Sequence, residues 1–369
     1  MQRLKKVILL LLVAMLSTSS MTVSSVAFNE VNLTDITLKS ELEGVDGVLP
    51  GAANPDGVLN TTALSDSEET DDESSAYFDS LVTYRDVIYK TTEFGQELKL
   101  DILMPTNDVY GNRVPVVMFV AGSGWINEIN REALVVKGRE LSTAELLERG
   151  YAFVTIEHRL CNGLNNGFTG NVTDVKDAVR WIRANSNVYG FDPNNIGIEA
   201  ASAGAHLSLL AAYTADDAFI GDEALSAYSS EVNYIVDINA PMAPLTVDDL
   251  DSLTIAQRIE FQAKLSFLFT RTMFLSNLSE EDISVIDSVN VLHRIGERNV
   301  PTLVFHGTAD TTVDIQNSST FVGALQNAGI ECVYKWVEGA EHGLVGGSDS
   351  DLQEVAQMTV DFITDHYQS

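Results

Sequence analysis

Residues 195–207 read N-I-G-I-E-A-A-S-A-G-A-H-L, and this stretch decides the fold. A short strand-forming run is followed by Ser202 between small residues, and then by residues that favour a helix. A tight strand-to-helix turn of this kind exposes a serine hydroxyl and is called a nucleophile elbow. The stretch therefore predicts a nucleophile at Ser202, with an acid and then a histidine further along the chain.

Both expected partners follow predicted strands. Asp310 ends the segment 306–310 (H-G-T-A-D), and His342 lies in the segment 341–343 (E-H-G). A serine hydroxyl is a poor nucleophile until a base takes its proton, and an imidazole can both accept and return a proton near neutral pH. A carboxylate would hold that imidazole in one tautomer. Asp314 competes for this role but lies farther from the strand end, which favours Asp310.

The developing negative charge of a tetrahedral intermediate also needs hydrogen-bond donors. The main-chain N–H of Ala203 is one candidate, because it belongs to the residue after the nucleophile. The others are expected from a loop that follows an earlier strand, and 121–125 (A-G-S-G-W) follows the apolar run 116–120. The sequence thus supplies every part that acyl transfer requires.

Apolar strands alternate with amphipathic helices along most of the chain, which predicts an α/β fold with a mostly parallel sheet of about eight strands. The first two strands are expected to form an antiparallel hairpin at the sheet edge. Active groups gather at the carboxyl ends of strands in such sheets. The predicted strands are 82–90, 98–103, 116–121, 151–156, 196–200, 234–239, 302–306 and 332–337, and the predicted helices are 138–149, 172–186, 203–215, 316–328 and 351–366.

These segments resemble the α/β-hydrolase fold esterases and lipases, and in particular the bacterial feruloyl-esterase and acetyl-esterase kind of carboxylesterase. The likeness runs from about Tyr84 to the C-terminus. That family usually carries H-G-G-G-W where this chain has 121–125, and G-x-S-x-G where it has 200–204. The resemblance implies that Ser202, Asp310 and His342 form a catalytic triad, with Ser123, Gly124 and Ala203 as oxyanion donors. It also implies substrate contacts from Trp125 and from His158, which stands where the family often has tyrosine.

Three departures from that pattern bear on activity. Ala200 replaces the first elbow glycine, which is tolerable with slight strain. Ala121 replaces a histidine that usually braces the loop, and Ser123 replaces a glycine, which is penalised if that position needs a positive φ. We expect an active secreted serine hydrolase acting on small-molecule or carbohydrate-linked esters. The alternatives are a prolyl-oligopeptidase-like peptidase and a catalytically weakened hydrolase-fold binding protein.

Three regions lie outside the expected sheet. Residues 1–27 read as a signal peptide, with a basic start, a short apolar core and small residues before the expected cleavage site, so we expect export to the periplasm or the medium. Residues 28–76 are an acidic, serine-rich extension expected to be flexible, and 77–369 form the catalytic domain. Residues 241–299 exceed a short crossover and contain an apolar helix at 255–275, expected either to cap the site or to pack at the sheet edge.

Composition limits the partners. The 369 residues carry a formal net charge of −31, so nucleic acid and anionic membranes are not expected partners. No spacing of His, Asp or Cys predicts a metal site, and no phosphate loop follows a strand, so no cofactor is expected. Cys161 and Cys332 give no disulfide framework, although an exported protein could pair them. His206 is expected to be structural, and His306 to orient the loop of Asp310 or to pack in the core.

Overall fold

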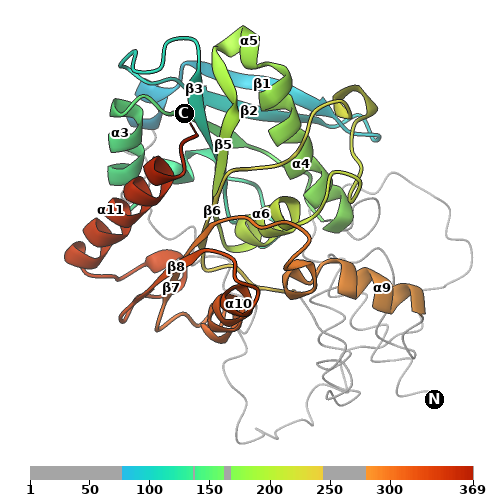
Figure 1. Cartoon of the computed structure of the whole chain (residues 1–369), viewed down its shortest axis with the longest axis vertical. Helices are drawn as coiled ribbons and strands as arrows, with labels where there is room; N and C mark the ends of the chain where they lie inside the picture. The colour runs from blue at the N-terminus through green and yellow to red at the C-terminus, as the bar shows by residue number, and fades with distance from the viewer. Residues whose placement is uncertain (1–76, 136–137, 162–167, 244–279, 369) are drawn as a thin grey trace, which may run out of the picture. The chain divides into compact units, whose positions relative to one another are not determined.

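A single eight-stranded sheet organises the described part of the chain (Figure 1). The computed structural model describes residues 77–135, 138–161, 168–243 and 280–368. The strands occur in the order β1-β2-β4-β3-β5-β6-β7-β8 across the sheet. They are β1 (Tyr84–Thr91), β2 (Glu97–Leu103), β3 (Val114–Val120), β4 (Ala152–Ile156), β5 (Phe191–Ala201), β6 (Ile235–Ile238), β7 (Thr302–Gly307) and β8 (Cys332–Val337).

The pairing is parallel from β4 to β8 and antiparallel at one edge. β2 pairs antiparallel with both β1 and β4, so β1 and β2 form the predicted edge hairpin. All eight predicted strands are present, and most bounds differ by one or two residues. β5 is the exception, because it begins at Phe191 instead of 196. Phe191 is buried and pairs with Val114, an interaction that the turn-forming residues around Pro193 conceal in the sequence.

Helices cover both faces of the sheet, as expected for buried parallel strands. One face carries α4 (Phe168–Ala184), α6 (Ser202–Tyr213) and α10 (Gln316–Asn327), and the other carries α3 (Glu140–Glu148) and α11 (Asp349–Asp365). The smaller helices are α5 (Ser186–Tyr189), α9 (Glu280–Ser288), η3 (Arg131–Val135), η4 (Glu223–Leu225), η5 (Val291–Arg294) and η6 (His342–Leu344). None of the described helices has the length and apolarity needed to cross a membrane.

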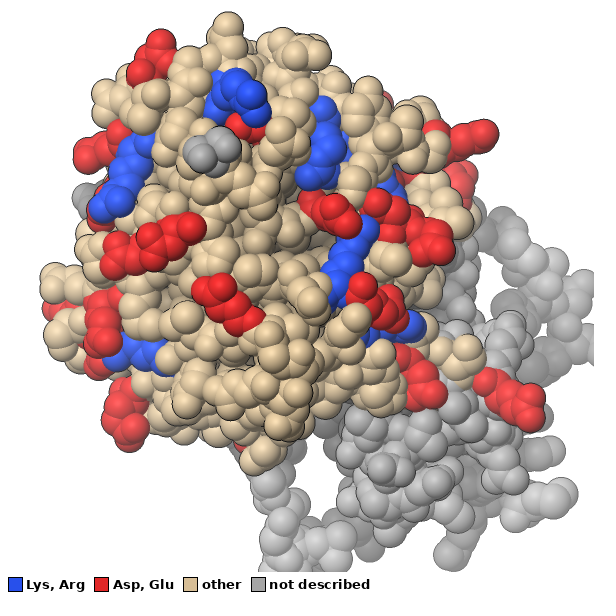
Figure 2. Space-filling view, in the orientation of Figure 1, with Lys and Arg blue, Asp and Glu red and all other residues tan. Residues whose placement is uncertain are grey.

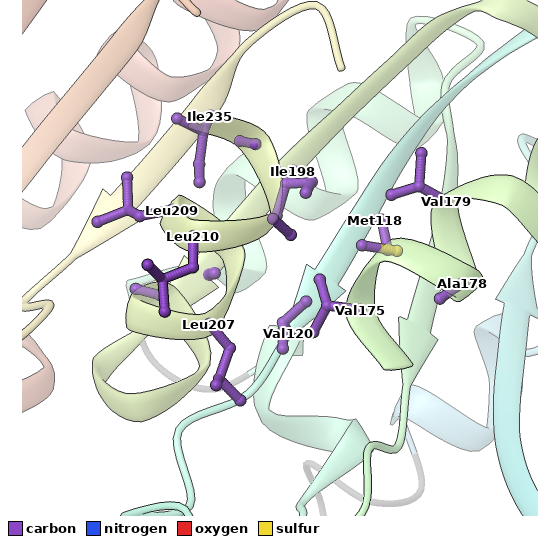
Figure 3. Packing of buried hydrophobic residues seen from close by; sticks show 14 of the residues in the cluster. Met118, Val120, Val175, Ala178, Val179, Ile198, Leu207, Leu209, Leu210 and Ile235 are labelled. Atoms are coloured by element: carbon purple, nitrogen blue, oxygen red, sulfur yellow. The ribbon is translucent and has the colours of Figure 1, made fainter. Parts of the chain in front are cut away.

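The core that holds the elbow lies between β3, β5 and the two central helices. Figure 3 shows Val120 of β3 and Ile198 of β5 facing Val175 of α4 and Leu207 of α6. All four side chains are fully buried. Burial of an aliphatic side chain of this size contributes about 1.5–3 kcal/mol, so this layer fixes α6 firmly against the sheet. Because α6 begins at Ser202, the same packing fixes the expected nucleophile.

Several expectations fall outside the described residues. These are the signal segment 1–27, the extension 28–76 and most of the 241–299 insertion, including the apolar helix at 255–275. Of that insertion the structure describes 241–243 and the stretch from α9 onward. Cys161 is buried and Cys332 is partly exposed on β8, and both are free thiols.

Charged side chains on the described surface are mixed in sign. On the face shown in Figure 2, Lys and Arg stand singly among Asp and Glu and do not merge into a basic patch. Exposed ion pairs also occur on the described surface, for example Arg149 with Glu145 on α3. This face therefore does not show the clustered cations that phosphate backbones bind.

Candidate active site

Ser202 stands at the junction of β5 and α6 in a strained backbone conformation. Its φ is 52°, in the left-handed region that non-glycine residues rarely adopt. The preceding residue, Ala201, is still extended, so the chain turns from strand to helix within one residue. Such strain persists when the surrounding structure over-determines it, and it is common at nucleophile elbows. At this turn the Ser202 hydroxyl lies against His342, in the loop that follows β8.

The close approach at this turn requires a glycine at position 204. A Cβ on Gly204 would lie 2.4 Å from the carbonyl oxygens of both Val120 and Ala121. Ala200, by contrast, is fully buried within the core beside β3, so its methyl group is accommodated. The departure from the family pattern at position 200 is therefore tolerated, whereas the glycine at 204 is required.

His342 connects Ser202 to Asp310. The Oγ atom of Ser202 lies 2.8 Å from Nε2 of His342, and Nδ1 of His342 lies 2.7 Å from Oδ2 of Asp310. These residues follow β5, β7 and β8, at the carboxyl ends of three strands of the parallel sheet. An ionised carboxylate can only accept, so Nδ1 of His342 carries the proton and Nε2 is free to accept one from Ser202. The structure thus brings the three predicted residues together in the predicted order.

Asp310 is held as an anion by several donors. Its Oδ1 accepts from the backbone N–H groups of Thr312 and Val313, at 2.8 and 2.9 Å. Its Oδ2 accepts from Nδ2 of Asn239, at 2.8 Å, in addition to His342. Burial works to raise the pKa of Asp310, but the hydrogen bonds from His306, His342 and Val313 outweigh it and hold that pKa well below its usual range. The carboxylate therefore keeps its charge throughout the range in which proteins work.

Two residues around Asp310 extend the predicted site. Asn239 directly follows β6 and has a φ of 56°, so a strained turn positions its side-chain amide. The sequence analysis did not identify Asn239, although a polar residue at the end of a strand was a usable signal. His306 is fully buried, with Nδ1 on Ser318 Oγ at 2.6 Å and Nε2 on Val313 O at 2.8 Å, so it orients the Asp310 loop as expected. Asp314 instead accepts a hydrogen bond from the backbone N–H of Gln316 at the start of α10, and Asp310 is the carboxylate that bonds to His342.

The loop 121–125 lies against the nucleophile. A Cβ on Gly122 would lie 2.9 Å from Cβ of Ser202, which shows how closely the two backbones approach. Gly124 and Trp125 both have positive φ, at 55° and 65°, whereas Ser123 does not. The substitution at Ser123 therefore brings no left-handed strain. Its side chain is buried, and its hydroxyl has no hydrogen-bond partner among the described residues.

The start of α6 also presents donors toward the same place. The first amides of a helix, here including that of Ala203, have no acceptor within the helix. They carry a partial positive charge that favours an anion nearby. The arrangement can therefore generate a nucleophilic oxygen and offer main-chain donors beside it.

The two residues expected to contact substrate are Trp125 and His158. Trp125 is hydrogen-bonded to another side chain, and His158 is buried. Nε1 of Trp125 donates to Nδ1 of His206 at 3.3 Å. His158 is 2% exposed, and its Nδ1 bonds to the carbonyl oxygen of Arg159 at 2.8 Å. Burial lowers the pKa of His158, although its bond to the Arg159 carbonyl and the charge of Asp174 work in the other direction. Direct contact of either side chain with substrate stays a prediction.

Comparison with known proteins identifies the family to which the chain is similar. The BD-FAE family model matches residues 100–325. A non-reducing polyketide synthase of Stereocaulon alpinum is 25% identical over 353 residues, which cover 82% of this chain and 13% of the synthase. Esterase LipC of Mycobacterium tuberculosis is 26% identical over 230 residues, which cover 62% of this chain and 53% of LipC. The chain thus spans about half of LipC and a small part of the synthase.

A solved structure shares the fold. The thermophilic esterase Est2 from Thermogutta terrifontis, with butyrate bound, superposes with a TM-score of 0.60 and 24% sequence identity. The match covers 76% of this chain and 94% of that protein. The likeness confirms the predicted α/β-hydrolase fold.

Proposed function

Since the chain belongs to the BD-FAE family, we propose that it is a serine hydrolase that cleaves carboxylic esters through an acyl-enzyme. The observation that carries the proposal is the hydrogen-bonded series from Ser202 through His342 to Asp310, with spacings of 2.8 and 2.7 Å. A nucleophile, a base and an orienting anion in this order are the set that acyl transfer needs. The esterase-named relative LipC supports the same class of substrate.

In the first half of the proposed reaction, Ser202 Oγ attacks the ester carbonyl carbon while Nε2 of His342 takes the hydroxyl proton. The carbonyl oxygen becomes an anion in the tetrahedral intermediate. His342 then gives its proton to the alcohol oxygen as the carbon–oxygen bond breaks, and the acyl group stays on Ser202. Asp310 keeps its charge and stabilises the imidazolium that forms between these steps.

In the second half, water takes the place of the alcohol. His342 accepts a proton from that water as it attacks the acyl carbonyl, and then returns the proton to Ser202 Oγ as the acid leaves. Both halves pass through an oxyanion, for which we propose the amides of Ser123, Gly124 and Ala203 as donors. Loss of one such donor typically lowers kcat by about 10²–10³ fold.

Substrate and location extend the proposal. Small-molecule or carbohydrate-linked carboxylic esters fit the chemistry, and Trp125 and His158 are proposed to lie toward the bound substrate. The basic and apolar start of the chain supports export after cleavage near residue 27. A peptidase of the prolyl-oligopeptidase kind and an inactive scaffold are the competing functions.

A labelling experiment separates enzyme from scaffold. We expect a fluorophosphonate probe to label the purified protein, and Ser202→Ala to abolish both labelling and hydrolysis of p-nitrophenyl butyrate. Ser208→Ala, at a buried serine six residues further along α6, is the matched control and should still be labelled. An unlabelled wild type would favour the scaffold, and faster turnover of aminoacyl amides than of esters would favour the peptidase.

A further inference from the structure

A hydrogen-bonded relay connects the nucleophile's helix to the loop 121–125. Nε1 of Trp125 donates to Nδ1 of His206 at 3.3 Å, and Nε2 of His206 lies 2.8 Å from the carbonyl oxygen of Val289. A carbonyl oxygen only accepts, so Nε2 carries the imidazole proton and Nδ1 is left as the acceptor for the indole. The direction of both bonds is thus fixed by chemistry.

His206 is suited to hold this tautomer. Its side chain is fully buried, and its ring meets that of Trp125 edge to face, with centroids 5.6 Å apart at 89°. Burial lowers the pKa of His206 to about 4, although its bond to the Val289 carbonyl works in the other direction. The imidazole is therefore neutral from mildly acidic pH upward, and its acceptor stays available to the indole.

The loop needs such an anchor because its backbone is strained. Gly124 and Trp125 are consecutive residues with positive φ, a conformation in which the Cβ of a tryptophan crowds the backbone. Two backbone bonds oppose relaxation: Ser123 O accepts from Asn127 N at 2.9 Å, and Trp125 O accepts from Cys161 N at 2.8 Å. The contact with His206 adds a restraint on the position of the Trp125 side chain.

The position of Trp125 bears directly on catalysis. The peptide planes between Gly122 and Trp125 set the directions in which the amides of Ser123 and Gly124 point. If Trp125 relaxed to negative φ, the peptide between Gly124 and Trp125 would reorient, and Gly124 and the amides before it would shift with it. A misplacement of about 1 Å can cost roughly 10² fold in rate.

We infer that His206 is a positioning residue, which holds the oxyanion donors of the loop 121–125 in place through Trp125. This inference rests on the proposed function. His206 lies four residues after Ser202 on α6, so one helix sets both the nucleophile and, through the indole, the opposing donors. Val289 follows α9, which ties the described end of the 241–299 insertion to the same relay.

The experiment uses the full chain and compares ground-state with transition-state binding. Trp125→Phe keeps an aromatic ring and removes the donor. We expect its kcat for p-nitrophenyl butyrate to fall by about 10–100 fold, with KM changed less than about twofold. The affinity for an alkyl trifluoromethyl ketone, which forms an oxyanion on Ser202, should weaken by the same factor as kcat. If Trp125 only stabilised the fold, the losses of kcat and of ketone affinity would not be equal.

Two histidine variants dissect the relay. His206→Gln keeps a donor near Nε2 but loses the acceptor near Nδ1, and should match Trp125→Phe. His206→Asn keeps an acceptor near Nδ1, and should retain more kcat than His206→Gln. The double variant of Trp125→Phe with His206→Gln should be no slower than either single change, because both remove the same bond. Trp181→Phe on α4 is the matched ring control and should leave kcat unchanged.

The outcomes separate this inference from the proposed function. If wild type hydrolyses the ester, Ser202→Ala does not, and Trp125→Phe keeps wild-type kcat and ketone affinity, the relay has no positioning role. A higher KM together with a lower melting temperature, without a selective loss of ketone affinity, would also overturn the inference about His206. If wild type is neither labelled nor active, the proposed function itself fails. If the histidine variants do not fold, the kcat, the KM and the ketone affinity of Trp125→Phe decide the question alone.

Discussion

At the scale of single residues, the site depends on charges whose surroundings differ sharply. Asp310 is surrounded by donors and keeps its charge. Glu199 on β5 lies three residues before Ser202 and is 2% exposed, and its Oε2 has no hydrogen-bond partner among the described residues. It lines a small cavity together with Arg139 and with Gly343 and Leu344, the two residues that follow His342. Asp310 is thus stabilised as an anion by hydrogen-bond donors, whereas the buried Glu199 lacks such donors at Oε2.

Glu199 should give the protein a distinctive pH dependence. Burial raises its pKa to about 7, although Arg139 works to lower it. An unfolded glutamate titrates near 4.5, so between pH 4.5 and 7 the folded state binds a proton that the unfolded state has lost. The free energy of unfolding therefore falls as pH rises through this window. Glu199→Gln should remove up to about 3 kcal/mol of that decline, measured by urea unfolding at pH 5 and pH 8.

The control for this prediction is Glu97→Gln, which removes the same charge from the exposed start of β2. It should leave the difference between pH 5 and pH 8 as in wild type. If Glu199→Gln and wild type lose stability in parallel over this range, Glu199 is not the group responsible.

At the scale of elements, the elbow depends on how closely α6 approaches β3. Gly204→Ala would place a methyl carbon 2.4 Å from two backbone carbonyl oxygens, so the helix would have to move from the sheet. Overpacking of this kind costs about 1–3 kcal/mol or more. We expect the urea midpoint to fall accordingly, and hydrolysis to be lost with it.

Gly323 provides the matched control, because it also lies in a helix, α10, but a Cβ there would meet no atom within 4 Å. Gly323→Ala should stabilise the protein by about 0.5–1 kcal/mol, since alanine restricts the unfolded chain and favours helix. Equal effects of the two substitutions would show that the crowding at Gly204 is not what limits the elbow.

At the scale of the whole molecule, a buried charge network fastens the edge hairpin to the central layer. Nζ of Lys90 on β1 lies 2.7 Å from Asp174 and 2.6 Å from Asp177, both on α4. Arg159, after β4, also bonds to Asp174, and Arg180 bonds to Asp177. Every one of these side chains is less than a tenth exposed. The network ties together segments that are far apart in the sequence.

Lys90→Met tests the importance of this network. It keeps most of the side-chain volume but removes two charge-assisted hydrogen bonds, each contributing about 1.5–3 kcal/mol. We expect the free energy of unfolding at pH 7 to fall by about 3 kcal/mol in urea. Arg149→Ala, which breaks an exposed pair on α3, should cost no more than about 0.5 kcal/mol. Similar small losses in both variants would mean that the buried network contributes little.

The sequence by itself indicated where the eight strands lie along the chain and pointed to Ser202, Asp310 and His342 as the candidate reactive side chains. This was possible because the periodicity of apolar residues and the small residues around Ser202 are local properties of the chain. It also indicated which loops follow strand ends, and so which residues could meet at one edge of the sheet.

The tertiary structure alone decided how these residues are held. Asn239 and Asp310 are 71 positions apart, and Trp125 and His206 are 81 apart, so no local pattern reveals that they bond. The left-handed φ of Trp125 and the burial of His158 likewise depend on packing between distant segments. Hydrogen bonds are short-ranged, and only folding brings such partners within reach.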